Sequence, residues 1–244
     1  MFLRIEIRKL TLLASLALIA AGVQAQTPEK IIENHLKAIG GAKAYQKLQN
    51  FKREATVRIE SQNVELHGFF YSSRPNAIRQ DFEFQGQKIV QACDGKDAWT
   101  VNPLTGNPNV TDIPENIRGH MMRLSFFDDL FFDTPKKRGI TLAYQGKEEM
   151  EGGSFYKLHV TYKDGFSQDR FYAVDSGLLI KIVQQQPTAA GEAEVTTQYA
   201  DWREIDGVKF PYKVTNSTGQ TTEFLKTETN VALAENFFSR PVQD

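Results

Sequence analysis

The chain has only one cysteine, Cys93, among its 244 residues. An intramolecular disulfide is therefore excluded, even in a compartment where disulfides persist. Cys93 ends an apolar run, which favours a small packed thiol over a reactive one. The four histidines show no metal-ligand spacing, and a nucleophile elbow and a glycine-rich phosphate loop are missing. The sequence therefore predicts neither a catalytic site nor a metal or cofactor.

Long apolar runs are also rare, and the one present lies near the N-terminus. Leu10–Val23 carries no charge, follows Arg4, Arg8 and Lys9, and leads into the small-residue site that ends at Ala25. This pattern is typical of a secretory signal peptide that is cleaved after Ala25. A membrane anchor is less favoured, because the run falls short of the roughly 20 apolar residues that span a bilayer.

Neither sign of charge dominates the rest of the chain. Residues 1–25 hold three of the 29 basic and one of the 30 acidic side chains, so the mature chain keeps 26 basic and 29 acidic ones. Its net charge of −3 gives no electrostatic case for binding nucleic acid or an anionic membrane surface. We expect residues 26–244 to form a soluble, monomeric single domain.

Most of the chain consists of short segments in which apolar and polar residues alternate. Apolar and polar residues alternate in about eleven or twelve segments, which are separated by turns rich in glycine, asparagine and aspartate. Turn signals at intervals of about 8–12 residues are typical of antiparallel barrels and sandwiches. Two helices are expected at residues 28–39 and 42–48. The expected strands are residues 50–60, 63–71, 78–84, 88–93, 98–101, 140–148, 155–162, 166–174, 178–184, 194–202, 208–215 and 221–229.

Residues 113–133 interrupt the strands with a helical pattern that begins at Pro114 and Glu115. Its apolar residues occupy one stripe, Ile117, Met121, Leu124 and Phe131, and also positions beside that stripe, Met122, Phe126, Phe127, Leu130 and Phe132. A surface helix normally keeps one polar face, so this segment needs two apolar neighbours. It either fills the sheet as core or covers a ligand cavity.

The stretch from Arg74 to Pro103 carries the most specific pattern. Arg-Pro-Asn at residues 74–76 indicates a turn, because proline fixes φ and asparagine tolerates turn geometry. Ile78, Phe82 and Phe84 then share one strand face, opposite Arg79, Asp81 and Glu83. Asp-Gly-Lys-x-x-Trp at residues 94–99 and Asn-Pro at residues 102–103 follow. The meander places Trp99 and a cation, Arg74 or Arg79, near one rim of a sheet.

This order of turn, arginine, Asp-Gly-Lys-x-x-Trp and Asn-Pro resembles the LolA-like outer-membrane lipoprotein-sorting family. Leu233–Pro241, with its paired phenylalanines, resembles that family's C-terminal pattern, so the resemblance covers Ile31 to Pro241. It implies an α+β, mainly antiparallel fold: a curved, incomplete β-barrel with helices over the concave face. It also implies a periplasmic carrier for acylated lipoproteins or lipids, not an enzyme. Its partners would be an inner-membrane release machinery and an outer-membrane acceptor.

The resemblance also implies a site. Arg74 matches the arginine that reaches the closing helices, since a guanidinium can bridge several carbonyls of a helix. Arg79 is the competing candidate, and a surface turn arginine is the plainer alternative. Residues 113–133 then form the lid segment, whose aspartates 128, 129 and 133 are expected to face solvent. The expected lipid-binding and lid residues are Arg74, Phe82, Phe84, Trp99, Met121, Met122, Leu124, Phe127, Leu130 and Phe131.

Two other functions compete with that of a carrier. A periplasmic sensor or interaction module of the same fold would detect lipid or lipoprotein and act through a partner protein. A hydrolase is disfavoured, because no catalytic constellation can be assembled from the sequence.

Overall fold

The computed structural model describes residues 26–188 and 191–242. The expected signal peptide and its cleavage after Ala25 lie outside these residues, so the division of the chain at that point stays a prediction. Within the described ranges, no helix combines the length and the apolarity that crossing a bilayer requires.

All strands of the described residues pair antiparallel in one 13-stranded sheet. Their order across the sheet is β6-β5-β4-β3-β2-β1-β13-β12-β11-β10-β9-β8-β7, so only the step from β1 to β13 joins strands distant in sequence. In chain order the strands are β1 Asn50–Ile59, β2 Val64–Ser73, β3 Ala77–Phe84, β4 Gln87–Cys93, β5 Ala98–Asn102, β6 Asn107–Asp112, β7 Thr141–Met150, β8 Gly153–Thr161, β9 Ser167–Ala173, β10 Leu179–Thr188, β11 Gly191–Ile205, β12 Val208–Asn216 and β13 Gln220–Thr229.

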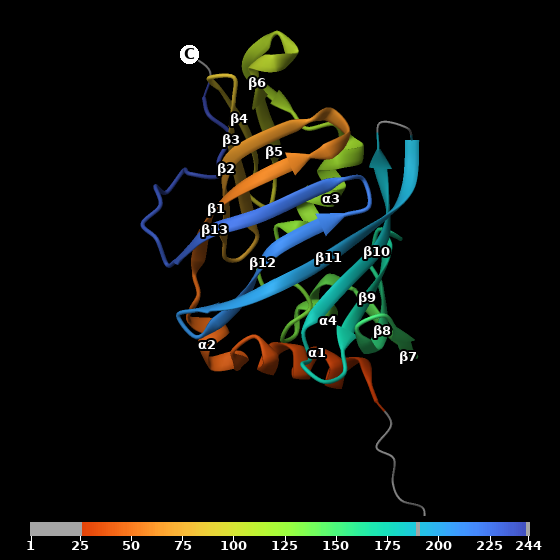
Figure 1. Cartoon of the computed structure of the whole chain (residues 1–244). Coiled ribbons are helices and arrows are strands. Elements are labelled where there is room, and N and C mark those ends of the chain that lie inside the picture. Colours follow the sequence, from red (N-terminus) through yellow and green to blue (C-terminus); the bar gives the residue numbers. More distant parts are fainter. Residues whose placement is uncertain (1–25, 189–190, 243–244) are drawn as a thin grey trace, which may run out of the picture.

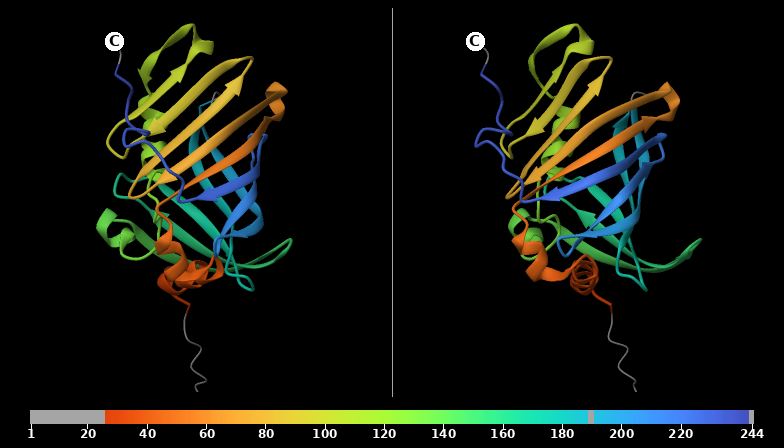
Figure 2. Two further views of the ribbon diagram at one scale, coloured as in Figure 1. Left: turned by 90° about the vertical axis from the view of Figure 1, so that its left-hand side faces the viewer. Right: turned by 60° about the vertical axis from the view of Figure 1, so that its left-hand side comes forward.

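The sheet curves round without closing, and β6 and β7 remain its free edges (Figure 1). Figure 2 shows two wings, β2–β6 and β7–β10, that face each other across the helices of the chain. The curved, incomplete barrel expected from the resemblance is therefore confirmed.

The sheet has one strand more than the twelve segments expected, and the extra strand is β6. Its sequence, Asn-Pro-Asn-Val-Thr-Asp, offers only two residues that favour strands, so alternation could not reveal it. β6 forms because β5 presents a ready partner, with Trp99 opposite Asp112 and Thr100 opposite Thr111. A free edge tolerates Pro108 and a short, polar strand.

Helices cover the concave face and one end of the sheet. α1 (Pro28–Ala38) lies across that end, and α2 (Gly41–Lys47) follows it, as predicted (Figure 1). The Thr27 hydroxyl accepts a hydrogen bond from the Lys30 amide at 3.2 Å and so caps α1. The buried side of α1 packs into the largest apolar cluster of the described residues, where each fully buried aliphatic side chain stabilises the fold by about 2 kcal/mol. That cluster includes Ile31, Ile32, Leu36, Leu130, Phe131, Leu158, Val160 and Ile182.

The lid segment contributes a shorter helix than its pattern predicts. α3 spans Glu115–Leu124 and ends at Ser125, and turns lead from there to α4 (Thr134–Arg138). Asp129 and Phe132 adopt positive φ values of 45° and 58°, which break the helix. The continuous stripe from Ile117 to Phe131 was therefore wrong, and Ile117 is 41% exposed.

The C-terminal segment, residues 230–242, runs over the convex face of the first wing (Figure 2). The indole N–H of Trp99 donates to the Phe238 carbonyl at 3.1 Å, and Arg79 donates to the Phe237 carbonyl at 2.7 Å. Arg240 binds Asp97 in the β4–β5 turn at 2.8 Å. Trp99 is thus buried on the face opposite the helices, where it anchors the end of the chain.

The corner between α1 and α2 is pressed against the β11–β12 turn at Gly40. A Cβ on Gly40 would lie 1.9 Å from the Gly207 carbonyl oxygen, and Gly40 has a φ of +121°. The Lys209 amide donates to the Ile39 carbonyl at 2.9 Å and holds this approach. The next residue, Gly41, has a φ of +82°, but a Cβ there would meet no atom within 4 Å.

We expect Gly40→Ala to destabilise the fold more than Gly41→Ala. Both replacements meet the strain of a positive φ, about 1–3 kcal/mol. Only Gly40→Ala also collides with backbone, which adds about 1–3 kcal/mol for an overpacked site. Urea unfolding of the two variants measures the difference. Equal losses would show that the corner is not tightly packed against the β11–β12 turn.

Candidate functional site

Arg74 lies in the β2–β3 turn and joins the sheet to both the helical end and the lid segment. Its Nε donates to the Leu48 carbonyl at 2.6 Å and its Nη2 to the Tyr45 carbonyl at 3.3 Å, at the end of α2. Its Nη1 donates to the Asp128 carboxylate at 2.5 Å. The guanidinium also stacks over Phe127, 4.6 Å from the ring centroid. Arg74, and not Arg79, therefore contacts the lid segment.

A second arginine binds the next residue of the lid segment. Arg170 of β9 is 5% exposed, and it donates to both carboxylate oxygens of Asp129, at 2.5 and 2.9 Å. The Tyr162 hydroxyl lies 3.3 Å from Arg170 Nη2. With its amide oxygen turned to Arg170, Gln168 accepts from Nε at 2.8 Å and donates to the Gln184 side chain at 2.6 Å. These bonds satisfy a cation that would otherwise be costly to bury.

Electrostatics keep this pair ionised. Burial raises the pKa of the Asp129 carboxyl, but the charge and hydrogen bonds of Arg170 outweigh burial, so the pKa is lowered overall. The pair therefore stabilises the fold above the unfolded pKa of an aspartate, and that contribution is lost as the pH falls through the lowered folded pKa.

Both ends of α3 are tied to turns of opposite wings. Arg118 lies 3.4 Å from Asp97 in the β4–β5 turn. Arg123 donates to Asp164 in the β8–β9 turn at 2.6 Å. Because the two turns belong to different wings of the open sheet, α3 bridges the opening between them, as Figure 2 shows. Four arginine–aspartate pairs thus hold the lid segment.

Two of the three aspartates expected to face solvent are partly exposed and also pair with arginines of the sheet. Asp128 and Asp129 are the lid-segment partners of Arg74 and Arg170, whereas Asp133 forms a surface pair with Lys137 at 2.7 Å. The sequence pattern did not predict the pairs with Arg74 and Arg170, because these arginines lie 54 and 41 residues away. A local charge pattern carries no information about such distant partners.

A cavity of about 500 Å³ lies between the lid segment and the concave face of the sheet. Its lid-segment lining is His120, Arg123, Leu124, Phe126 and Asp129. Apolar residues of the strands, and Phe166 just before β9, form part of its wall; the strand residues are Phe70, Leu179, Ile182, Trp202, Pro211, Val214 and Phe224. Its volume falls in the range of about 300–1,000 Å³ that is typical of small-molecule sites.

Of the ten expected site residues, Leu124 lines this cavity and is 55% exposed. Phe82 packs edge-to-face on the cavity residue Phe70, with ring centroids 5.4 Å apart. Phe84 is half-buried near the end of β3. Trp99 lies in β5, next to the edge strand β6, but on the opposite face of the sheet, so its place at the cavity was wrong.

The remaining expected residues of the lid segment pack as core. Met121 contacts a cluster with Ile78 and Ala98, and the Met122 sulfur lies 3.2 Å from Cys93 Sγ. Phe127, Leu130 and Phe131 belong to two further apolar clusters. The sequence left open whether the lid segment packs as core or covers a cavity. It does both, because one side of it packs as core and the other side faces the cavity. Cys93 is buried, and burial raises the pKa of its thiol, as expected for a packed cysteine.

Most of the cavity residues that were not predicted from the sequence lie on strands. Phe70, Ile182, Val214 and Phe224 lie on inward-facing strand positions, and alternation alone could have marked them as inward. Alternation could not tell which inward positions border a cavity and which meet a helix.

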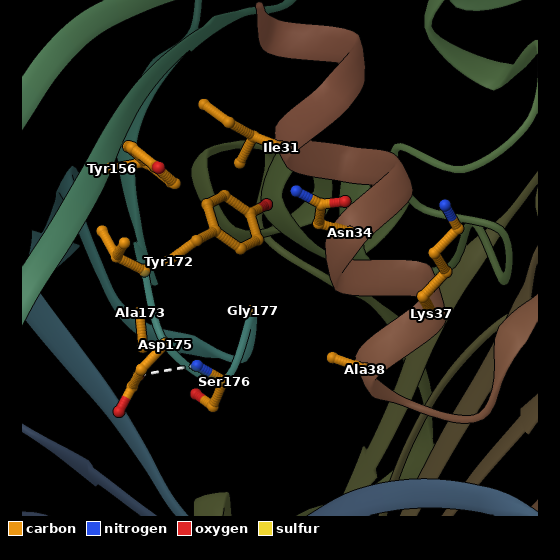
Figure 3. Close-up of a pocket in the computed structure, with 11 residues that line it drawn as sticks. Ile31, Asn34, Lys37, Ala38, Tyr156, Tyr172, Ala173, Asp175, Ser176 and Gly177 are labelled. Carbon is orange, nitrogen blue, oxygen red and sulfur yellow. Dashed lines mark hydrogen bonds between the residues drawn. The ribbon is translucent and has the colours of Figure 1, made fainter. Parts of the chain in front are cut away.

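Two of the other hollows among the described residues border α1. One, of about 380 Å³, lies between α1 and the β9–β10 turn (Figure 3). There His35 Nδ1 lies 3.0 Å from the Gly177 carbonyl and fixes α1 to the turn. The other, of about 520 Å³, is a surface groove between α1 and α4 with Leu36, Phe132 and Leu142 in its lining.

Comparisons with known proteins bear on the fold. No protein-family model matches the chain, and no curated protein matches its sequence. Solved structures do match. An outer membrane lipoprotein-sorting protein domain from Vibrio parahaemolyticus superposes with a TM-score of 0.57 at 16% identity, covering 87% of this chain and 97% of that one. A LolA superfamily protein from Nitrosomonas europaea gives 0.58 at 13% identity, covering 88% and 98%.

The chain has the LolA-like fold. A DUF1329 family protein from Desulfovibrio piger shares it, with a TM-score of 0.54 at 13% identity and coverage of 88% of this chain and 98% of that one. The fold expected from the Arg74–Pro103 pattern is thus confirmed over nearly the whole length of these LolA-like structures. At these identities the likeness concerns the fold.

The two aspartate pairs of the lid segment should differ in strength. We expect Asp129→Asn to lower the free energy of unfolding by about 2–3 kcal/mol, because it leaves Arg170 buried without its charge partner. The matched change Asp128→Asn should cost about 1 kcal/mol, since Arg74 is 20% exposed whereas Arg170 is 6% exposed, so Arg74 keeps contact with water when its partner is neutral. Urea unfolding measures both values. A larger loss for Asp128→Asn would contradict the assignment of Arg170–Asp129 as the stronger tie.

Two histidines should make the fold sensitive to mild acid. Burial lowers the pKa of His35 and of His120 to about 4, against an ordinary value of 6.5. The folded state therefore binds fewer protons than the unfolded state between these values, so stability is complete above about pH 6.5 and is lost toward pH 4. We expect a loss of about 2 kcal/mol per histidine between pH 7 and pH 5.

Unfolding in urea at several pH values measures this loss. The double variant His35→Gln, His120→Gln should flatten the dependence, and His67→Gln, which changes an exposed histidine, should keep it. An unchanged slope in the double variant would rule out these two groups as its source.

Proposed function

We propose that the mature chain is a periplasmic carrier that takes the acyl chain of a lipoprotein or lipid into the cavity beneath the lid segment. The observation that supports this most is the position of the cavity, between a curved sheet and a segment whose helix α3 is tied to both wings by ion pairs. Burying hydrocarbon there is favourable by about 0.8 kcal/mol for each CH₂ group. The fold it shares with a lipoprotein-sorting domain agrees with this role.

Release of cargo requires that the cavity open, and the arrangement of the lid segment supports this. Exposed ion pairs contribute little to stability, about 0–1 kcal/mol each. Arg118–Asp97 and Arg123–Asp164 are partly exposed, so α3 can leave the turns at modest cost. Movement of α3 would uncover the cavity behind Leu124. In this proposal the cargo comes from an inner-membrane release machinery and passes to an outer-membrane acceptor, without chemical conversion.

Filling the cavity should abolish binding. Val214 lines it from β12, so we expect Val214→Trp to weaken binding of a dansyl-labelled fatty acid at least tenfold by occupying its space. The neighbouring Lys213 is exposed on the opposite face, and Lys213→Trp is the matched control. Fluorescence titration of delipidated protein measures both affinities. If delipidated wild-type protein binds no acyl probe, or if both variants bind equally well, the carrier proposal fails at this cavity.

A transfer assay separates the carrier from the sensor alternative. Loaded protein is mixed with acceptor vesicles, and the movement of labelled lipid is followed over time. A carrier releases its lipid to the vesicles, whereas a sensor keeps it until a partner protein binds. Mass spectrometry of lipid extracted from purified protein identifies the natural cargo.

A further inference from the structure

The cavity is unusually polar for a site that holds only hydrocarbon. Alongside its apolar wall, it is lined by Gln80, His120, Arg123, Asp129, Tyr162, Gln168, Arg170, Gln184, Gln186, Thr197, Tyr199, Asn216, Gln220 and Thr222. Asp129, Arg170, Gln168 and Gln184 already bind one another. A purely apolar ligand would still displace water from the remaining polar groups and give them no new partner, which is unfavourable. The lining therefore favours a ligand that brings polar atoms inside.

Two hydrogen-bond donors of the cavity have no acceptor. Among the buried side-chain nitrogen and oxygen atoms of the described residues, only three have no partner, and they belong to Gln26, Arg123 and Trp202. Arg123 Nε and Trp202 Nε1 both belong to residues that line this cavity. Buried donors are normally paired, so these two indicate a ligand that supplies acceptor atoms.

The charges that border the cavity are positive on balance. Arg170 and Asp129 neutralise each other. Arg123 donates from Nη1 to Asp164, and the Nε of Arg123 has no acceptor. Asp164 lies outside the cavity lining, and its side chain is 53% exposed. His120 is uncharged near neutral pH, because burial lowers its pKa to about 4. An anion entering the cavity would therefore meet a cation that is already desolvated.

We propose that the cavity binds an amphiphile whose anionic oxygen headgroup, a carboxylate or a phosphate, enters beneath the lid segment and accepts hydrogen bonds from Arg123 and Trp202. Its alkyl chain lies along the wall formed by Phe70, Val214 and Phe224. This inference rests on the proposed function and names the class of ligand for the same cavity. The headgroup also touches α3 through Arg123, so binding and the position of α3 are linked.

The test compares probes that share a palmitoyl or hexadecyl chain and differ in headgroup. Palmitate and palmitoyl lysophosphatidic acid carry anionic oxygens, monopalmitin is neutral, and hexadecyltrimethylammonium is cationic. Each displaces a dansyl-labelled fatty acid from delipidated full mature protein. We expect both anionic probes to bind at least tenfold more tightly than the cationic one, as for a hydrogen bond to a charged group. Tighter binding of palmitate would indicate a carboxylate headgroup, and tighter binding of the lysophosphatidic acid would indicate a phosphate headgroup.

Variants assign the preference to the two donors. Trp202→Phe removes Nε1 and keeps a ring, and Arg123→Met removes the cation and keeps the length of the side chain. Each should reduce the anionic-to-cationic ratio several-fold. Asp164→Asn breaks the tie of α3, keeps Arg123 Nε and removes the charge that offsets Arg123, so it should keep the ratio or raise it. Trp99→Phe removes an indole N–H on the convex face, away from the cavity, and should leave the ratio intact.

Fluorescence supplies an independent reading. The chain has two tryptophans, so Trp99→Phe leaves Trp202 as the only emitter. Donation from its indole N–H to an anion should shift its emission to longer wavelength with palmitate and not with hexadecyltrimethylammonium. Equal affinities for all four probes, a preference for the cation, or a ratio that survives both donor variants would overturn this inference and leave the carrier proposal standing. Failure of every probe to bind would overturn both.

Discussion

A carboxylate paired with a buried arginine determines where the lid segment lies. Removing the arginine from water is costly, and only good geometry with satisfied hydrogen bonds compensates for it. Arg170 meets this condition through Asp129, Tyr162 and Gln168, and Asp129 takes a positive φ of 45° to reach it. Once Asp129 is fixed, Leu130 and Phe131 enter the core beside α1. The ion pair and the apolar core thus support one position of residues 125–133.

Fewer buried contacts fix α3 than fix residues 127–131 of the lid segment. Residues 127–131 combine two aspartate pairs with three buried apolar side chains, whereas α3 has Met121 as its deeply buried contact and two partly exposed ion pairs. Local stability follows buried apolar contact, so α3 opens at lower cost than the turns that follow it. The gradient places the most movable part of the segment next to Leu124, which borders the cavity. A carrier needs this combination of an anchored end and a movable end.

The sequence predicted the sheet well because alternation and turn residues are local signals. α1, α2 and twelve strands followed from them, and the Arg74–Pro103 pattern indicated the curved, incomplete barrel. β6 escaped because its pairing with β5 outweighs its own weak propensity. Trp99 was assigned to the wrong face, because a single strand does not reveal which side of the sheet the helices cover. The arginine partners of Asp128 and Asp129 could not be predicted either, since these pairs depend on contacts between distant segments.

One carboxylate connects the two faces of the first wing. Asp97 accepts from Arg118 of α3 on the concave side and from Arg240 of the C-terminal segment on the convex side. Arg240 and Arg118 therefore share one acceptor, and the C-terminal segment is linked through Asp97 to the helix that covers the cavity. A substitution at Arg240, on the face away from the cavity, changes the charge that holds α3 at Asp97.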